Sequence, residues 1–145
     1  MIYTNSDGGA RDNPGPGAIG AIVRNEGEIL IRYSEFIGEN VTNNMAEYDA
    51  LIKALELASK ITKDEVTCIL DSELVVKQLL GEYKVKNRVM LEKFLKVQKL
   101  QENFKKIRYL HSSRWDKFQQ IADELVNEEL NKRGYPKSIY KKKAK

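Results

Sequence analysis

Apolar and polar positions along the chain follow two different periods, and each period marks its own kind of element. Residues 2–6 and 18–24 are rich in β-forming side chains without a breaker, and residues 28–37 alternate as strands do. The turn sequence Asn25-Glu26-Gly27 between the second and third runs is typical of a hairpin. The chain is therefore expected to begin with three antiparallel strands.

A helical period follows the third strand. Asn44 and Glu47 have the spacing of a capping box. Apolar side chains then recur three and four residues apart, at Tyr48, Leu51, Ile52, Leu55 and Ala58. This pattern predicts a helix over residues 44–60.

The second half of the chain alternates between strands and helices. Residues 66–70 form a short apolar run typical of a strand buried on both faces, and residues 107–110 predict a fifth strand. Helices are predicted from a Ser72 cap through Leu80, over residues 89–103 after a linker at 84–87, and over residues 118–130. The order βββαβααβα predicts an α/β fold with a mixed five-stranded sheet flanked by helices.

Charge is distributed unevenly along the 145 residues, whose net charge is +4. From residue 134 onward there are five lysines and no acid, so the rest of the chain carries 20 basic and 21 acidic residues. Residues 84–108 hold nine bases and two acids, which suits a polyanionic partner, although a solvated helix face would look the same. We expect one domain over residues 1–133 and a basic tail over residues 134–145.

Composition also bears on location. Cys68 is the single cysteine and lies in an apolar run, as a buried thiol in a reducing compartment would. No stretch reaches the length of a membrane span, and the first residues resemble a strand rather than a charged and then apolar leader. We therefore expect a cytoplasmic protein without a membrane partner.

The first candidate for chemistry is Asp7, which falls where the first strand is expected to end. Gly8 and Gly9 follow it, and residues 13–17 read Asn-Pro-Gly-Pro-Gly, a dense set of turn residues. A carboxylate at a rigid strand end beside a glycine-rich loop can hold a metal ion against a polyanion. A β-turn aspartate bonded to its own backbone is the alternative for Asp7 alone.

Three further acids lie at special places. Asp71 ends the fourth strand, Glu47 lies in the first predicted turn of the long helix, and Asp123 lies inside the last helix. If the first and fourth strands are neighbours, Asp7 and Asp71 lie side by side and their repulsion implies a divalent cation. Oxygen ligands favour Mg²⁺ or Mn²⁺, and one histidine and one cysteine give no zinc set.

Each of these acids also has a purely structural interpretation. Glu47 could be only a capping-box residue, Asp71 a helix cap and Asp123 a surface acid. Periodicity alone does not bring the four acids together.

Five segments, taken together and in order, resemble type 1 ribonuclease H. They are Asp7-Gly8-Gly9 with the turn at residues 13–17, TNNMAEY at 42–48, LDSELVVKQL at 70–79, GEYKVKN at 81–87 and ADEL at 122–125. The resemblance runs from Tyr3 to about Leu130. It implies the ribonuclease H-like fold, in agreement with the predicted order of elements.

The resemblance also implies an activity. Members of this family cleave the RNA strand of an RNA/DNA hybrid with two Mg²⁺ ions, for which Mn²⁺ can substitute. By motif, the four acids that hold the metals are Asp7, Glu47, Asp71 and Asp123. One metal activates water and the other stabilises the leaving 3′ oxygen, which gives 5′-phosphate and 3′-hydroxyl ends.

Polar residues around the acids match substrate contacts of the family. Asn13, Asn43 and Asn44 correspond to positions that touch the minor groove and the ribose 2′-hydroxyls, which an amide can both donate to and accept from. Thr42 and Asn87 correspond to a pocket for a DNA phosphate. The alternative is that these residues are turn and cap residues.

The sequence departs from the family pattern in two places. The stretch from His111 to Ile121 is about two residues longer than usual, and His111 is the sole candidate for the loop histidine that assists proton transfer or product release. An ordinary histidine at a strand end is the alternative. No basic, tryptophan-containing protrusion lies between Gly81 and Asn87, so residues 84–108 are expected to take over part of its role.

The leading hypothesis is a metal-dependent endonuclease that acts on RNA/DNA hybrids as a monomer, without an obligate protein partner. One alternative is a nuclease of the same fold that acts on double-stranded RNA or branched DNA. Another is an inert hybrid-binding module, which retention of all four acids disfavours because clustered negative charge repels phosphate. For the tail, a basic arm that touches phosphate competes with a clasp in which Tyr135, Ile139 and Tyr140 dock on the body.

Overall fold

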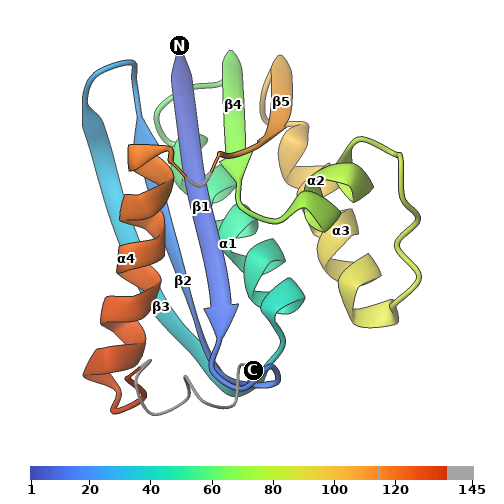
Figure 1. Cartoon of the computed structure of the whole chain (residues 1–145). Coiled ribbons are helices and arrows are strands. Elements are labelled where there is room, and N and C mark those ends of the chain that lie inside the picture. Colours follow the sequence, from blue (N-terminus) through green and yellow to red (C-terminus); the bar gives the residue numbers. More distant parts are fainter. Residues whose placement is uncertain (114, 137–145) are drawn as a thin grey trace.

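The computed structural model describes residues 1–113 and 115–136, and it confirms the predicted order of elements (Figure 1). The strands are β1 (Ile2–Ala10), β2 (Gly15–Arg24), β3 (Ile29–Val41), β4 (Glu65–Leu70) and β5 (Lys106–His111). The helices are α1 (Asn43–Ala58), α2 (Glu73–Leu79), α3 (Arg88–Gln101) and α4 (Lys117–Lys132). The two alternatives for the tail concern residues that the structure describes only in part. Tyr135 lies within the described residues, and Ile139, Tyr140 and the tail lysines lie outside them.

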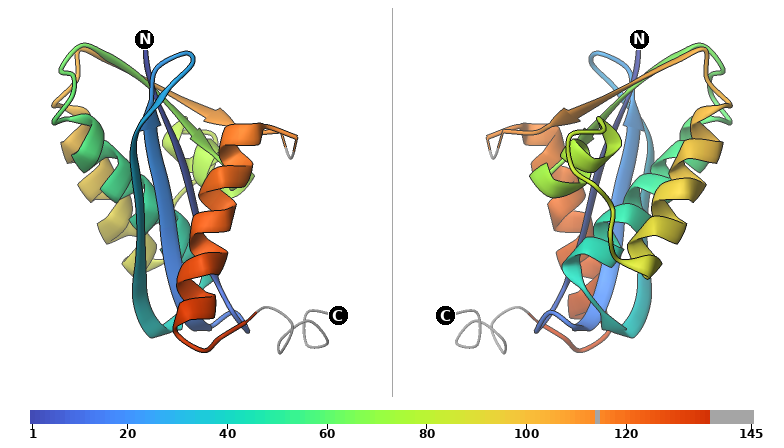
Figure 2. Two further views of the ribbon diagram at one scale, coloured as in Figure 1. Left: turned by 90° about the vertical axis from the view of Figure 1, so that its left-hand side faces the viewer. Right: turned by 90° about the vertical axis from the view of Figure 1, so that its right-hand side faces the viewer.

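The five strands form one mixed sheet in the order β3-β2-β1-β4-β5. β1 pairs antiparallel with β2 and parallel with β4, so the change from antiparallel to parallel pairing falls at β1. Figure 2 shows the sheet between two layers, with α1 and α3 on one face and α4 on the other. Binding sites gather where strand direction or order changes in such sheets, beside β1 and β4 here.

Each face of the sheet has its own apolar core. The larger cluster lies under α1 and α3 and contains the fully buried Tyr48, Leu51 and Leu55 of α1. The smaller one lies under α4 and joins Ala18 to Val126 and Leu130. These two cores hold α1 and α4 against opposite faces of β1 and β2, so both helices can reach the end of β1.

The first strand is longer than predicted, which corrects the position of Asp7. β1 continues to Ala10, and Asp7 pairs with Gly20 of β2 inside the antiparallel ladder. On its other side, the parallel pairing with β4 ends at Ser6 and Leu70. Asp7 therefore lies where β1 loses one neighbour, because the glycines that suggested a turn continue the ladder to β2.

The start of α1 also differs from the prediction. Thr42 is the N-cap, and its Oγ1 accepts a hydrogen bond of 3.1 Å from the backbone N–H of Met45. The expected capping box of Asn44 and Glu47 is wrong, since Glu47 lies beyond the first turn of the helix. Thr42 is the cap in place of Asn44 because its hydroxyl reaches the third N–H of the helix. The Glu47 side chain therefore remains available for another contact.

The other helix starts agree with their local sequence. Ser72 caps α2 as predicted, and Asn87 and Asp116 cap α3 and α4 with their side-chain oxygens. Gly81, the predicted stop of α2, has a positive φ of 81°, a conformation that glycine adopts without strain. Within the described part of the chain, no helix has the length and apolar character needed to cross a membrane.

Candidate active site

Asp7 and Glu47 form the buried centre of the site. Their exposed fractions are 7% and 6%, and their carboxyl groups are hydrogen-bonded to each other. Glu47 Oε1 also accepts a hydrogen bond of 2.5 Å from the backbone N–H of Gly8. A Cβ on Gly8 would lie 2.2 Å from the Ala46 carbonyl, so the glycine is what allows β1 and α1 to approach this closely.

Asp71 and Asp123 lie at the exposed rim of this centre. Asp123, on α4, also interacts with Asp7 and accepts a hydrogen bond of 3.3 Å from Asn127. Asp71 directly follows β4, and its charge acts on Glu47. These interactions link the four acids in pairs, Asp7 with Glu47 and with Asp123, and Glu47 with Asp71. The four side chains come from β1, α1, the end of β4 and α4.

Burial and mutual repulsion shift the two inner carboxyl groups in the same direction. Burial is the largest cause that raises the pKa of Asp7 well above its usual range, and the charges of Glu47 and Asp123 add to it. Burial, with a contribution from the charge of Asp71, raises the pKa of Glu47 to about 7. The pair therefore holds a proton that two separate carboxylates would release near pH 4.

The donor set fits a hard divalent cation. All four side chains offer carboxylate oxygens, the ligands that Mg²⁺ and Mn²⁺ prefer, and a cation between them would relieve the repulsion that raises the pKa values. Within residues 1–113 and 115–136, no three His, Cys, Asp or Glu side chains are gathered closely enough to be a preformed metal centre. The chemistry of the donors, and not a ready-made cluster, is what supports metal binding.

A buried amide pair lies next to the acids. Asn5 Nδ2 donates to Gln119 Oε1 at 3.2 Å, and Gln119 Nε2 donates to the carbonyl of Ser6 at 2.7 Å. Asn5 is two residues before Asp7 on β1, and Gln119 is one helical turn before Asp123 on α4. Because side chains two apart on a strand and four apart on a helix share a face, the amide pair lies beside the Asp7–Asp123 pair and sets its spacing.

Sequence reasoning did not select Asn5, Gln119 or the buried Arg24 that supports them. Arg24 Nε donates to Asn5 Oδ1 at 2.9 Å, and its guanidinium lies 4.0 Å from the ring centroid of Phe118 and 4.5 Å from that of Tyr3. A polar Asn on the same strand face as Asp7 was the available signal. The sequence alone does not show that α4 covers that face, so this asparagine could not be selected from it.

His111 lies beside Asp71. It is the last residue of β5, where it is paired with Leu70, and its exposed ring places Nε2 3.0 Å from the backbone carbonyl of Asp71. His111 is therefore at a strand end and not within a loop, as the alternative interpretation held. It is nevertheless close to one of the four acids.

Asn13 and Asn43 connect the β1–β2 turn to the start of α1. Asn13 Oδ1 accepts from the Asn43 N–H at 2.8 Å, and Asn43 Oδ1 accepts from the Ala10 N–H at 2.9 Å. Both amide oxygens thus have local partners, while both side chains remain at the surface with Asn44. The three residues form one exposed amide patch beside the buried acids.

Thr42 and Asn87 are both N-cap residues, of α1 and α3. Asn87 is exposed, and its Oδ1 accepts from the Met90 N–H at 3.1 Å. The two helices pack against each other. Two helix N-termini, each with a partial positive charge, are compatible with a phosphate.

The chain is similar to a known family and to proteins of that family. The family model described as "Reverse transcriptase-like" matches residues 5–129. The chain is 36% identical over 132 residues to the protein named "Bifunctional protein Rv2228c" of Mycobacterium tuberculosis, which covers 90% of this chain and 35% of that protein. It is 37% identical over 131 residues to "Ribonuclease HI" of Halobacterium salinarum, which covers 90% of this chain and 64% of that one.

Among solved structures, the crystal structure of LC11-RNase H1 in complex with an RNA/DNA hybrid superposes with a TM-score of 0.85 and 41% identity. That match covers 92% of this chain and 99% of the other. The chain spans about a third of the length of the mycobacterial relative and just under two thirds of the Halobacterium relative. Because the family model and the LC11 structure both match nearly the whole chain, this protein belongs to the type 1 ribonuclease H family.

Proposed function

We propose that this chain is an endonuclease that hydrolyses the RNA strand of RNA/DNA hybrids and leaves 5′-phosphate and 3′-hydroxyl ends. The observation that carries the proposal is the meeting of Asp7, Glu47, Asp71 and Asp123 from four separate elements. Such a set of acids repels phosphate unless cations are bound, so a mere binding module would gain nothing from it. The hybrid in the LC11 structure supports the choice of substrate.

The family is metal-dependent, and we propose two Mg²⁺ ions, replaceable by Mn²⁺, held by the four acids. When bound, the ions supply electrostatic stabilisation of the attacking and leaving oxygens of the phosphodiester. The buried pair Asp7 and Glu47 forms the rigid inner part, since Gly8 and the Asn5–Gln119 pair restrict their movement. Asp71 and Asp123 are exposed, and the scissile phosphate approaches from their side.

The remaining selected residues are assigned to substrate contact. We assign Asn13, Asn43 and Asn44 to the minor groove, where the exposed amides can pair with 2′-hydroxyls and so distinguish RNA from DNA. Thr42 and Asn87 are assigned to a phosphate of the DNA strand, through the starts of α1 and α3. His111, beside Asp71, is assigned to proton transfer or product release.

The catalytic unit is proposed to be residues 1–133, acting as a monomer in the cytoplasm without an obligate partner. The buried Cys68 thiol supports a reducing compartment. Residues 134–145 are proposed as a basic tail that contributes to phosphate binding.

One gel experiment tests the proposal. Labelled RNA/DNA hybrid, double-stranded RNA and double-stranded DNA are each incubated with the protein in Mg²⁺, Mn²⁺ or EDTA. We expect cleavage of the RNA strand of the hybrid, with either metal and not in EDTA. Cleavage of double-stranded RNA in preference to hybrid would favour the same-fold alternative. No cleavage of any substrate, together with a shift of the labelled hybrid on a native gel, would favour the inert module.

Asp71→Asn is the matched variant for the same gel. The change preserves shape and removes one ligand charge, so turnover is expected to fall at least a hundredfold while the fold persists. Glu73→Gln is the control, because Glu73 is an exposed acid two residues away that pairs with Lys77 at 2.9 Å. Asp71→Asn turnover above about a tenth of wild type would contradict the assignment of Asp71 as a metal ligand.

A further inference from the structure

Trp115 is an exposed aromatic side chain that the proposed chemistry leaves unexplained. It is the single tryptophan of the chain, and it lies on the connection between β5 and α4. Its exposed fraction is 79%, the highest among the large hydrophobic side chains of the described residues, the next being Leu95 at 55%. An exposed indole offers a large flat surface on which a ligand can pack.

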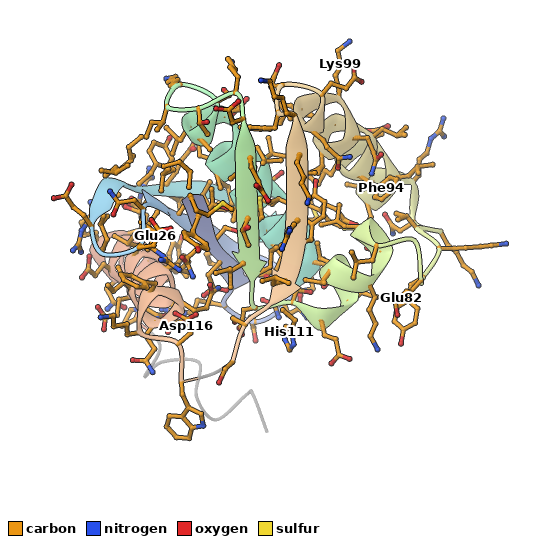
Figure 3. The ribbon with its side chains drawn as sticks, turned by 90° about the horizontal axis from the view of Figure 1, so that it is seen from above. Glu26, Glu82, Phe94, Lys99, His111 and Asp116 are labelled. Atoms are coloured by element: carbon orange, nitrogen blue, oxygen red, sulfur yellow. The ribbon has the colours of Figure 1, made fainter. Side chains whose placement is uncertain are left out.

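Both ends of this connection are held in place. On the β5 side, Ser112 N–H donates to the Leu70 carbonyl at 2.8 Å, which continues the pairing with β4 past His111. On the α4 side, Asp116 caps the helix through the N–H groups of Phe118 and Gln119 at 2.8 and 3.1 Å. Figure 3 shows His111 and Asp116 along the same edge of the molecule.

The backbone at Trp115 is itself bonded. Ser113 Oγ accepts from the Trp115 N–H at 3.2 Å, and the Ser113 carbonyl accepts from the Asp116 N–H at 3.1 Å. The backbone N–H of Trp115 and that of Asp116 are therefore both held by Ser113. Little ordering is then needed when a partner covers the indole.

The connection also lies between two of the rim acids. His111, at its start, is 3.0 Å from the Asp71 carbonyl, and α4, which it enters, carries Asp123 two turns later. The exposed Lys117 follows Trp115 by two residues and adds positive charge. An apolar ring flanked by a base at the rim of an acid cluster fits a nucleic acid strand, whose sugars and bases are apolar faces between phosphates.

We propose that Trp115 packs against a nucleotide of the bound hybrid next to the position of cleavage. This inference rests on the proposed function and adds a substrate contact to the same site. The contact would come from the connection between β5 and α4, which carries none of the four acids. The ring can cover a sugar face in the minor groove of a paired nucleotide or stack on an unpaired base, and the experiment separates these.

The test uses Trp115 as its own reporter, because no other indole contributes to the fluorescence. Fluorescein-labelled hybrid is titrated into the whole chain in Ca²⁺, with a gel confirming that the hybrid stays intact, and binding is followed by anisotropy. In parallel, tryptophan emission and its quenching by acrylamide are measured with unlabelled hybrid. We expect the quenching constant to fall at least twofold along the same binding curve.

Two variants complete the test. Trp115→Ala is expected to weaken hybrid binding roughly tenfold and Trp115→Phe to restore most of it, as base–aromatic contacts do. Leu30→Ala is the control, since Leu30 is also exposed, at 40%, but lies on the edge strand β3. Unchanged melting temperatures would show that neither variant acts through folding.

Each result decides the proposal. Saturable anisotropy with unchanged emission, unchanged quenching and wild-type affinity of Trp115→Ala would overturn it and leave the proposed function standing. Absence of hybrid binding by anisotropy would overturn both. The same quenching measurement is made with a blunt hybrid and with a hybrid that has a single-stranded RNA extension. Equal protection of the indole by both hybrids identifies the paired nucleotide as its contact. Protection only by the hybrid with the extension identifies the unpaired base.

Discussion

The backbone N–H of Gly8 donates a 2.5 Å hydrogen bond to Glu47, and this bond joins the middle of β1 to α1 at the buried centre of the acid cluster. The bond depends on the close approach of strand and helix. A Cβ at position 8 would lie 2.2 Å from the Ala46 carbonyl carbon and oxygen. The adjacent Gly9 has no such constraint, since its nearest neighbours would be 3.9 Å or more away.

We therefore expect Gly8→Ala to lower the free energy of unfolding by about 1–3 kcal/mol through overpacking against backbone. Hybrid cleavage should fall with it, because Glu47 is displaced from Asp7. Gly9→Ala is the control and should leave both within error. Denaturant melts and cleavage rates of the two variants make the comparison, and equal effects at both positions would contradict the close-packing argument.

The raised pKa values of Asp7 and Glu47 predict that the stability of the fold depends on pH in the absence of metal. Between about pH 4.5 and 7, the folded chain keeps protons on this pair that the unfolded chain has released. Stability attributable to the pair is therefore greatest below pH 4.5 and is lost as pH rises through about 7. In EDTA, the melting temperature of wild type should fall by several degrees relative to Glu47→Gln over this range.

Metal should reverse this trend, since cations bind the deprotonated carboxylates. Added Mg²⁺ should raise the melting temperature more at pH 8 than at pH 5. A wild-type curve parallel to that of Glu47→Gln in EDTA would show that the pair does not hold the proton.

The bonds of Gln119 to Asn5 and to the Ser6 carbonyl predict a positioning role for this side chain. Gln119→Leu keeps the volume but leaves two buried polar groups unpaired, which costs about 1–3 kcal/mol each before relaxation. Loss of these bonds should shift α4 and with it Asp123. We therefore expect kcat to fall about tenfold with little change in KM. Gln98→Leu is the control, because Gln98 is a partly buried glutamine on α3 and not on the helix that carries Asp123. A higher KM with unchanged kcat would instead indicate a substrate contact.

Asn43 and Asn44 are adjacent, but we expect their substitution by alanine to affect stability differently. Asn43 accepts from Ala10 N–H, so Asn43→Ala should cost about 1 kcal/mol of stability and weaken hybrid binding as well. Asn44 is not the helix cap, so Asn44→Ala should leave the melting temperature unchanged and weaken only hybrid binding, by a similar amount. Thr42→Ala reports the loss of the true cap. Thermal melts and hybrid affinities distinguish the three variants, and a destabilised Asn44→Ala would contradict the assignment.

Tyr135, the second residue of the proposed tail, contacts the body of the protein. Its ring stacks on Phe36 at 6.2 Å, its hydroxyl donates to Glu39 at 2.6 Å, and its carbonyl accepts from Arg11 Nε at 2.9 Å. Tyr135 is thus docked on the body. This agrees with the clasp at the one residue of that set that the structure describes.

We expect truncation after Pro136, which keeps Tyr135, to leave the melting temperature unchanged. If the lysines beyond it contact two or three phosphates, the slope of log affinity against log salt should fall by roughly 0.7–0.9 per contact. Truncation after Arg133 should in addition lower the melting temperature. An unchanged salt slope in both truncations would contradict the basic arm and leave only the clasp.

Local sequence determined the order of elements and the choice of the four acids. Strand and helix periods, the Ser72 cap and the Gly81 stop depend on neighbouring residues, so they could be predicted without knowledge of the fold. The identity of Asp7, Glu47, Asp71 and Asp123 followed from motifs whose order along the chain is specific. What these motifs did not contain was the distance between them.

The tertiary structure decided how the acids are arranged and what supports them. Asp7 belongs to a continuing strand because β2 offers a partner up to Ala10, and Glu47 bonds to Gly8 because Thr42 already caps α1. Asn5 acquires its role only when α4 places Gln119 over β1, and the exposure of Trp115 could not be predicted from its neighbours in sequence. Each of these depends on contacts between segments far apart in sequence, whose register and spacing are set by packing and not by local propensity.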